Sequence, residues 1–116
     1  MRSKDEEALK DIAANIGLIR GMGSKLSIAQ FETDWVAFYA TTRALEIISE
    51  ASRRLSPALT ARHPEVPWAQ IRAAGNVYRH EYRDVLEEFV IDVATRQLDA
   101  LEQAISQEIN RLRELP

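Results

Sequence analysis

The sequence has 116 residues, 46% of them hydrophobic, and a formal net charge of −3. This length suits one domain over residues 1–116, and the lack of cysteine excludes disulfides and thiolate metal ligands. No apolar run approaches the roughly 20 residues that a membrane-spanning helix needs. The charged stretch Met1–Asp11 does not resemble a signal peptide, so we expect a cytoplasmic protein.

The first half of the chain predicts two helices. Ser3 and Ser27 each stand three residues before Glu or Gln, a pattern typical of helix starts. The first helix is expected to end near Arg20, before a Gly-Met-Gly stretch, and the second to run from Ser27 to about Leu55. One face of the second helix carries residues spaced by four and three: Phe31, Trp35, Phe38, Thr42, Leu45 and Ile48. Such spacing indicates packing of helix against helix.

The second half predicts a short helix and two longer ones. Ser56-Pro57 suits the start of a short helix, because proline is favoured at the first helical position. A third main helix is expected from Pro67 towards His80, and Asp84 has the capping pattern before a last helix that ends near Leu112. The predicted fold is therefore all-α, an up-and-down bundle of four main helices plus a short one.

Positive charge is concentrated in the centre of the chain. From Arg43 to Arg83 there are seven arginines and four acids, a balance of +3, whereas the remainder has eight basic and fourteen acidic residues, a balance of −6. Arginine has the planar fork that suits phosphate. An ordinary solvated helical surface explains the same distribution about as well.

Four polar residues of the third main helix are candidates for chemistry. Arg72, Asn76 and His80 are spaced by four, and Arg79 falls beside them, so all four are expected on one helix face. An imidazole can exchange protons with RNA hydroxyls near neutral pH, while arginines stabilise charge on a transferring phosphate. From the spacing alone, an ordinary solvent-facing helix flank is the commoner explanation. The opposite face is expected to be core: Trp68, Ile71, Ala74 and Tyr78.

Two further observations narrow the chemistry. Gly75 lies inside this helix, where glycine costs about 1 kcal/mol relative to alanine, which suggests a close approach by another backbone or a ligand. Tight packing against the second predicted helix is the alternative and the commoner case. His63 and His80 are far apart in sequence, and no ligand spacing predicts a metal site. We therefore expect no metal and no cofactor.

The segment Val66–Tyr82 resembles the signature stretch of HEPN proteins of the HepT-like branch. In that family a proline and an aromatic residue lead into a helix that carries Arg-Asn, three residues, then His and, after one more residue, Tyr. Asn76, His80 and Tyr82 match this pattern. The resemblance implies a homodimer whose motif helices meet at a cleft, and a metal-independent ribonuclease toxin acting on RNA, with tRNA as a candidate. It also implies an MNT-type nucleotidyltransferase antitoxin, which silences the toxin by adding AMP to Tyr82.

The sequence departs from the family pattern at Gly75, where the family usually has arginine. Arg72 or Arg79 is expected to supply the cation, although neither occupies the same position. One alternative is therefore a catalytically weak helical module that binds a nucleotidyltransferase. A purely structural bundle is a second alternative, and it predicts no nucleotidyltransferase partner.

Overall fold

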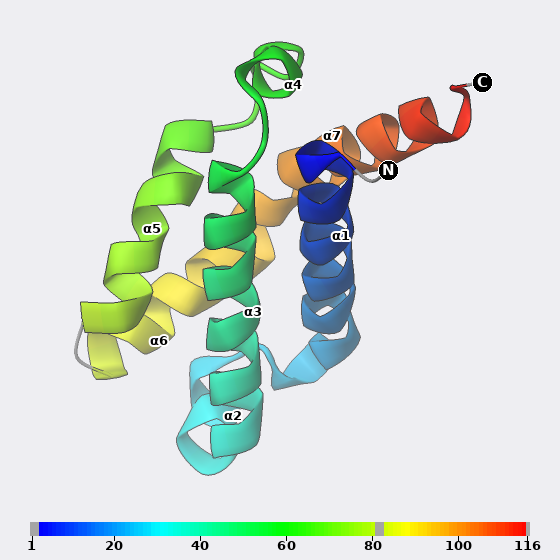
Figure 1. The fold of residues 1–116 in the computed structure, drawn as a ribbon. Helices are drawn as coiled ribbons and strands as arrows, with labels where there is room; N and C mark the ends of the chain where they lie inside the picture. Colours follow the sequence, from blue (N-terminus) through cyan, green and yellow to red (C-terminus); the bar gives the residue numbers. More distant parts are fainter. Residues whose placement is uncertain (1–2, 81–82, 116) are drawn as a thin grey trace.

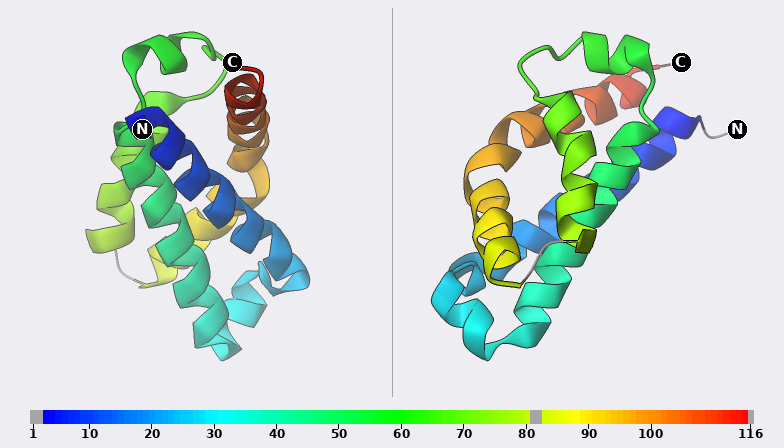
Figure 2. Two further views of the ribbon diagram at one scale, coloured as in Figure 1. Left: turned by 45° about the vertical axis from the view of Figure 1, so that its right-hand side comes forward. Right: turned by 90° about the vertical axis from the view of Figure 1, so that its left-hand side faces the viewer.

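Three helices stand side by side and a long curved rod crosses them. The computed structural model describes residues 3–80 and 83–115. The three neighbouring helices are α1 (Lys4–Met22), α3 (Trp35–Arg53) and α5 (Trp68–His80), with α3 in the middle (Figure 1). The rod consists of α6 (Arg83–Asp92), a π-helical segment (Val93–Gln97) and α7 (Leu98–Arg113). Its curvature is clearest in Figure 2.

Short elements connect the long ones. A 3-10 turn (Gly23–Lys25) and α2 (Ile28–Thr33) lead from α1 to α3, and α4 (Pro57–Ala61) lies between α3 and α5. The described residues form helices and no strands, which confirms the predicted all-α class. None of the described helices is long and apolar enough to cross a membrane.

Side-chain caps fix the helix starts. The predicted cap at Ser3 accepts a hydrogen bond from the backbone N–H of Glu6, and Ser27 accepts one from Gln30, both at 3.1 Å. Ser56 caps α4 in the same way, with proline at the first helical position as predicted. The third predicted cap, Asp84, is not the start of a helix, because α6 already includes Arg83; the Asp84 side chain lies outside the described part of the chain.

The helix predicted from Ser27 to Leu55 is interrupted. Asp34 leaves the helical conformation (φ −121°, ψ 87°), ends α2 and caps α3 by accepting a hydrogen bond of 2.9 Å from Ala37 N–H. Because the break changes the direction of the chain, Trp35 does not continue the apolar stripe of Phe31. The expectation that Trp35 packs in the core is therefore wrong: its side chain is largely exposed.

The core lies where α1, α3 and the rod meet. Its largest fully buried side chains include Phe31, Leu9, Ile12, Ile19, Leu45 and Leu101. Ion pairs tie the periphery together: Arg20 of α1 contacts Asp99 and Glu102 of α7, and Arg54 contacts Asp11 of α1. These pairs are solvent-exposed, so each contributes little to stability. Burial of the apolar faces is the main stabilising contribution.

The last predicted helix forms without a break, but its geometry changes along its length. Between Val93 and Gln97 its backbone widens into a π-helix. Thr95 lies in this segment, and its hydroxyl donates to the carbonyl of Ile91 at 2.6 Å. Side-chain hydrogen bonds of this kind compete with the helical ladder and bend helices. The rod curves at this point and thereby contacts both α1 and α3.

Candidate functional site

The predicted site residues lie along the seam between α3 and α5. The carbonyl of Arg72 accepts two hydrogen bonds from α3, one from the Ser49 hydroxyl at 3.1 Å and one from the Arg53 guanidinium at 2.9 Å. These bonds hold the first half of α5 against α3. The opposite face of α5 is turned inward as predicted, with Trp68, Ala74 and Tyr78 buried and Ile71 partly buried.

Gly75 allows a close approach at this seam. A Cβ atom on residue 75 would lie 3.1 Å from the Ser49 hydroxyl oxygen, closer than carbon and oxygen ordinarily approach. It would also lie 3.3 Å and 3.5 Å from Nη1 and Nη2 of Arg79. The neighbours of Gly75 are therefore side chains and not another backbone: Ser49 of α3 packs on one side, and the Arg79 guanidinium of the same helix lies over it.

Asn76 and Arg79 form a pair beside this glycine. Nη2 of Arg79 donates to Oδ1 of Asn76 at 3.0 Å, and Nη1 lies 3.9 Å from the Glu46 carboxylate of α3. Both members of the pair are exposed to solvent. The guanidinium is thus directed back along α5 and over Gly75. Its open face is available to an anion from solvent.

Arg72 is separate from this pair. Its side chain is half-buried, and its Nε–H is buried without a hydrogen-bond partner in the described structure. No hydrogen bond among the described residues joins it to Asn76 or Arg79. The prediction that one helix face gathers Arg72, Asn76 and Arg79 is therefore correct for helical position, but only the last two are in contact.

Two predicted residues cannot be placed at the level of side chains. His80 is the last residue of α5, one residue after Arg79 and four after Asn76, and its side chain lies outside the described part of the chain. Tyr82 lies wholly outside the described residues. The roles assigned to both remain predictions.

Glu46 and Ser49 belong to the site but were not predicted from the sequence. Both lie on α3, more than twenty residues before Gly75, and neither stands in a recognisable pattern. The close contacts of Gly75 identify Ser49, and the charge of Arg79 identifies Glu46. The glycine inside a helix was the one signal in the sequence that a neighbour had to be close.

A second polar cluster lies elsewhere, between α4 and α7. Nε2 of His63 lies 2.6 Å from the Glu108 carboxylate, which also accepts two hydrogen bonds from the Arg62 guanidinium. The Arg62 hydrogen bonds, followed by the His63 contact, lower the pKa of Glu108 from 4.5 to about 2 although burial opposes the shift. Trp68 closes the cluster, because its indole N–H donates to the carbonyls of Thr60 and His63. The cluster fastens the connection between α3 and α5 to α7.

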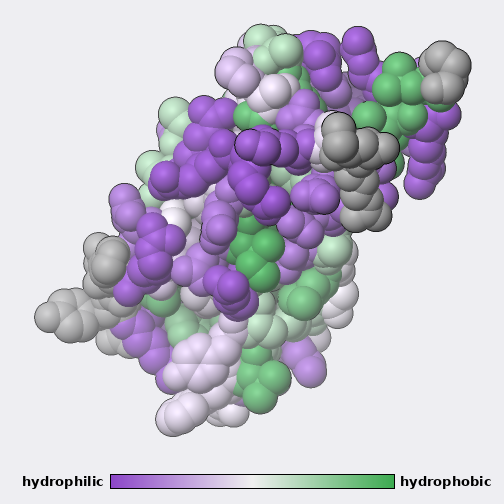
Figure 3. Space-filling view, in the orientation of Figure 1, coloured by the Kyte–Doolittle hydropathy of each residue, from purple (hydrophilic) through white to green (hydrophobic). Residues whose placement is uncertain are grey.

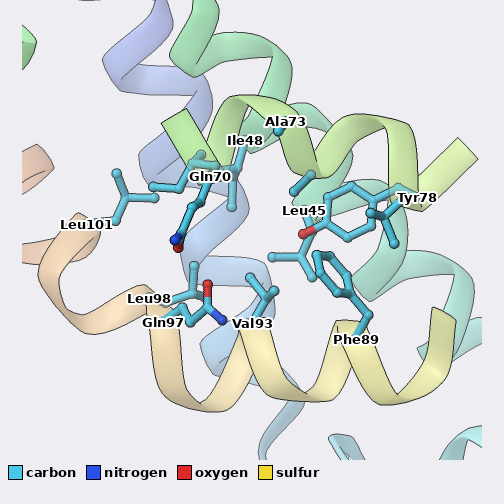
Figure 4. A pocket seen from close by; sticks show the side chains of 13 residues that line it. Leu45, Ile48, Gln70, Ala73, Tyr78, Phe89, Val93, Gln97, Leu98 and Leu101 are labelled. Atoms are coloured by element: carbon cyan, nitrogen blue, oxygen red, sulfur yellow. The ribbon is translucent and has the colours of Figure 1, made fainter. Parts of the chain in front are cut away.

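A cavity of about 300 Å³ opens on the other side of α5 (Figure 4). Its walls are mostly apolar side chains of α3, α5 and the rod, with Gln70 and Gln97 among its few polar groups. Tyr78 and Phe89 meet edge to face along it, with ring centroids 5.5 Å apart. Burial raises the pKa of the Tyr78 phenol well above its usual range, so the ring stays neutral. By helical position the cavity faces away from Arg79.

Among the described residues, no three His, Cys, Asp or Glu side chains gather closely enough to hold a metal ion. The described polar groups at the seam include the guanidinium groups of Arg72 and Arg79, the Asn76 amide and the Glu46 carboxylate.

The family model and the similar proteins indicate the same family. The family model for HepT-like ribonucleases matches residues 7–108. A protein named "Probable ribonuclease HepT" from Thermococcus cleftensis is 33% identical over 82 residues, which cover 71% of this chain and 74% of the relative. Two further relatives, each named provisionally as an RNase, come from Caldanaerobacter subterraneus subsp. tengcongensis and Methanocaldococcus jannaschii. They are 29% and 31% identical over 71% of this chain, and the matches cover 73% and 76% of the relatives.

No solved structure matches the chain significantly. The family assignment thus depends on sequence comparison, and the all-helical architecture agrees with it. The match spans nearly the whole chain and includes the seam, the glycine and the Asn76–Arg79 pair. The chain belongs to the HepT-like ribonuclease family.

Proposed function

We propose that this protein is a metal-independent ribonuclease toxin of a toxin–antitoxin pair. Two copies form a dimer in which their α5 helices meet at a cleft, and RNA is cleaved there. A nucleotidyltransferase antitoxin silences the toxin by adding AMP to Tyr82. Family membership supports the ribonuclease activity. The observation that carries the proposal is the Arg79 guanidinium, which Asn76 holds over Gly75 directly beside the position of the family's motif arginine.

Cleavage uses the substrate's own 2′-hydroxyl as nucleophile. Its oxygen bonds to the adjacent phosphorus, and its proton passes to an imidazole of His80. The bond from phosphorus to the 5′ oxygen then breaks, and this oxygen takes up a proton from an imidazolium. A histidine suits both transfers, because its unperturbed pKa lies near 6.5.

The arginines stabilise the extra negative charge on phosphorus. Arg79 is the better placed, since its guanidinium is exposed and its fork matches two phosphate oxygens. Asn76 positions that guanidinium through a hydrogen bond of 3.0 Å. Arg72 adds positive charge on the same helix, about one turn before Asn76 and about two turns before Arg79. Losing such a donor typically lowers the rate of a reaction about a hundredfold or more.

The first experiment incubates purified protein with total RNA or tRNA in EDTA. Wild type is expected to cleave and His80→Ala is expected not to. Arg79→Ala should lower cleavage about a hundredfold, whereas Arg96→Ala removes the same charge from the distant π-helical segment and should leave the rate unchanged. Equal losses from both arginine variants would contradict a specific role for Arg79.

A second candidate function is a helical module that binds a nucleotidyltransferase without cleaving RNA. Two observations favour it: glycine stands where the family has arginine, and the Glu46 carboxylate lies 3.9 Å from the replacing guanidinium. In this case neither wild type nor His80→Ala cleaves RNA, and overexpression does not stop growth. Co-expression with an MNT-type nucleotidyltransferase should still give a stable complex.

A further inference from the structure

An exposed aromatic surface lies on α3, on the same helix face as the candidate site. We define this aromatic face as Trp35, Val36 and Tyr39, whose exposed fractions are 59%, 77% and 58%. Large apolar side chains this exposed are uncommon as a group and mark interaction surfaces. In Figure 3 the less hydrophilic colours gather at the lower end of the molecule, where α2 leads into α3.

The Trp35 ring is held in place from one side. The Arg83 guanidinium lies 5.1 Å from the ring centroid and is itself fixed by Glu87 at 2.8 Å and by the carbonyl of Phe31 at 3.0 Å. A cation over one side of an indole leaves the other side available for stacking. Tyr39 is supported in a similar way, because its ring packs against Phe38 with centroids 5.6 Å apart.

The aromatic face continues into the arginine-rich seam. At 100° per residue, positions 35, 39, 43 and 46 project within about 80° of one another on α3. Position 43 is an exposed arginine and position 46 is the glutamate beside Arg79. A rise of 1.5 Å per residue separates Tyr39 from Glu46 by about 10 Å and Trp35 from Glu46 by about 16 Å.

These dimensions suit a short stretch of single-stranded nucleic acid. A stacked strand advances about 3.4 Å per nucleotide, so the aromatic rings lie roughly three to five nucleotides from Arg79. Proteins that bind unpaired strands combine a cationic track for phosphates with aromatic side chains for bases. Here Arg43 and Arg79 supply two cations against the one Glu46 carboxylate between them, which pairs with Arg43 at 2.7 Å and lies 3.9 Å from Arg79. The open faces of Trp35 and Tyr39 supply the rings. A duplex keeps its bases paired inside and cannot use such rings.

We propose that the aromatic face of α3 is a stacking platform for unpaired bases of the RNA substrate. The platform holds bases that flank the cleaved bond while Arg79 binds the phosphate. This inference depends on RNA being the substrate. It adds a group of residues on α3 that the family motif on α5 does not contain.

Tryptophan fluorescence tests the platform directly. The chain has two tryptophans, and Trp68 is 8% exposed with its indole N–H bonded to two backbone carbonyls. Quenching by RNA therefore reports on Trp35. The probe is a single-stranded oligoribonucleotide with 2′-O-methyl groups, which cannot be cleaved. Binding is thus measured whether or not the protein is a nuclease.

Wild type should show quenching with the single strand and none with a blunt duplex of the same sequence. Trp35→Ala and Tyr39→Ala should each weaken binding about tenfold or more, whereas Tyr39→Phe should bind nearly as wild type because it keeps a ring. Leu18→Ala removes a comparably exposed apolar side chain from α1 and should have no effect. Circular dichroism and thermal unfolding show that each variant is folded.

Two outcomes overturn the inference. Binding of RNA without quenching of Trp35, and without loss in Trp35→Ala, shows that the strand lies elsewhere while the proposed nuclease remains intact. The second outcome is that wild-type protein sediments as a dimer, Trp35→Ala sediments as a monomer, and RNA causes no quenching. This result would show that a second copy of the chain covers the aromatic face. Quenching without any cleavage of natural RNA supports the platform and contradicts only the proposed catalysis.

Discussion

Replacing Gly75 by alanine tests the geometry of the seam. The new methyl group would lie 3.1 Å from the Ser49 hydroxyl, which has to shift by a few tenths of an ångström and thereby strains its hydrogen bond to the Arg72 carbonyl. Losing this bond altogether costs about 1 kcal/mol, so the strain costs at most that much. Alanine in a helix interior stabilises by about 1 kcal/mol relative to glycine. The two contributions oppose each other, so the free energy of unfolding should change by less than about 1 kcal/mol.

The same methyl group should also shift Arg79 slightly, because Nη1 would lie 3.3 Å from it, whereas the 3.5 Å distance to Nη2 is an ordinary contact. The shift costs little stability because the guanidinium is exposed. A catalytic group moved by about 1 Å can lower the rate about a hundredfold, so a shift of a few tenths of an ångström should lower it severalfold. Gly75→Ala is therefore expected to be folded and nearly as stable as wild type, yet slower at cleaving RNA. Urea unfolding and the EDTA cleavage assay measure the two effects on one preparation.

The effect of the Ser49 contact can be separated from the helix propensity of alanine by making Gly75→Ala in a Ser49→Ala variant. In Ser49→Ala the hydroxyl that meets the methyl group is gone, so adding Gly75→Ala should stabilise by about 1 kcal/mol relative to Ser49→Ala alone. A loss of more than about 2 kcal/mol in that background would refute the reasoning, because it would show that a contact other than Ser49 fills the space. Unchanged cleavage by Gly75→Ala would show that the position of Arg79 over residue 75 does not matter.

Three further changes have defined outcomes. Because the folded pKa of Glu108 is lowered to about 2, its ion pair contributes fully above pH 4.5, at most about 3 kcal/mol, and this contribution disappears as the pH falls from 4.5 to 2. Glu108→Gln should lose this stabilisation at neutral pH, and its free energy of unfolding in urea should depend less on pH between 4.5 and 2. The same pH dependence in Glu108→Gln and wild type would contradict the lowered pKa of Glu108. Asn76→Ala should leave stability within about 0.5 kcal/mol and lower cleavage less than Arg79→Ala does, because it releases the guanidinium without removing it; kinetics on one RNA compare the two. Asp34→Ala should destabilise by about 1 kcal/mol, seen in thermal unfolding, because it removes the cap of α3, and equal stability would show that the turn forms without the carboxylate.

The sequence predicted the helices well where capping and periodicity agreed. Ser3 and Ser27 cap as expected, and the helix that ends at His80 lies where the proline and tryptophan placed its start. The break at Asp34 was missed because the apolar spacing continues through it, so periodicity alone did not reveal the change of direction. Aspartate is a good capping residue, but it lacked the glutamate or glutamine three positions later that marked the other starts.

Only part of the site could be predicted, because helical spacing gives the face on which a residue lies but not its contacts. A helical repeat places Arg72, Asn76 and Arg79 on one side of α5, and this much follows from sequence. Which of them meet depends on rotamers and on α3, a helix whose partners no local pattern gives. Glu46 and Ser49 could therefore not be predicted from the sequence, because only the fold places them beside Arg79 and Gly75.

The π-helical segment has a consequence for how the chain tolerates changes in length. A single π-turn holds one residue more than the α-helix would, without rotating the helix that follows it. Deleting one residue within Val93–Gln97 should therefore give an ordinary α-helix in which α6 and α7 still present their buried faces to the core. One residue removed from the middle of α7 would instead turn everything after it by about 100° and expose Ile105 and Glu108. Among the positions of the rod, this segment is where a homologous chain one residue shorter fits the same fold.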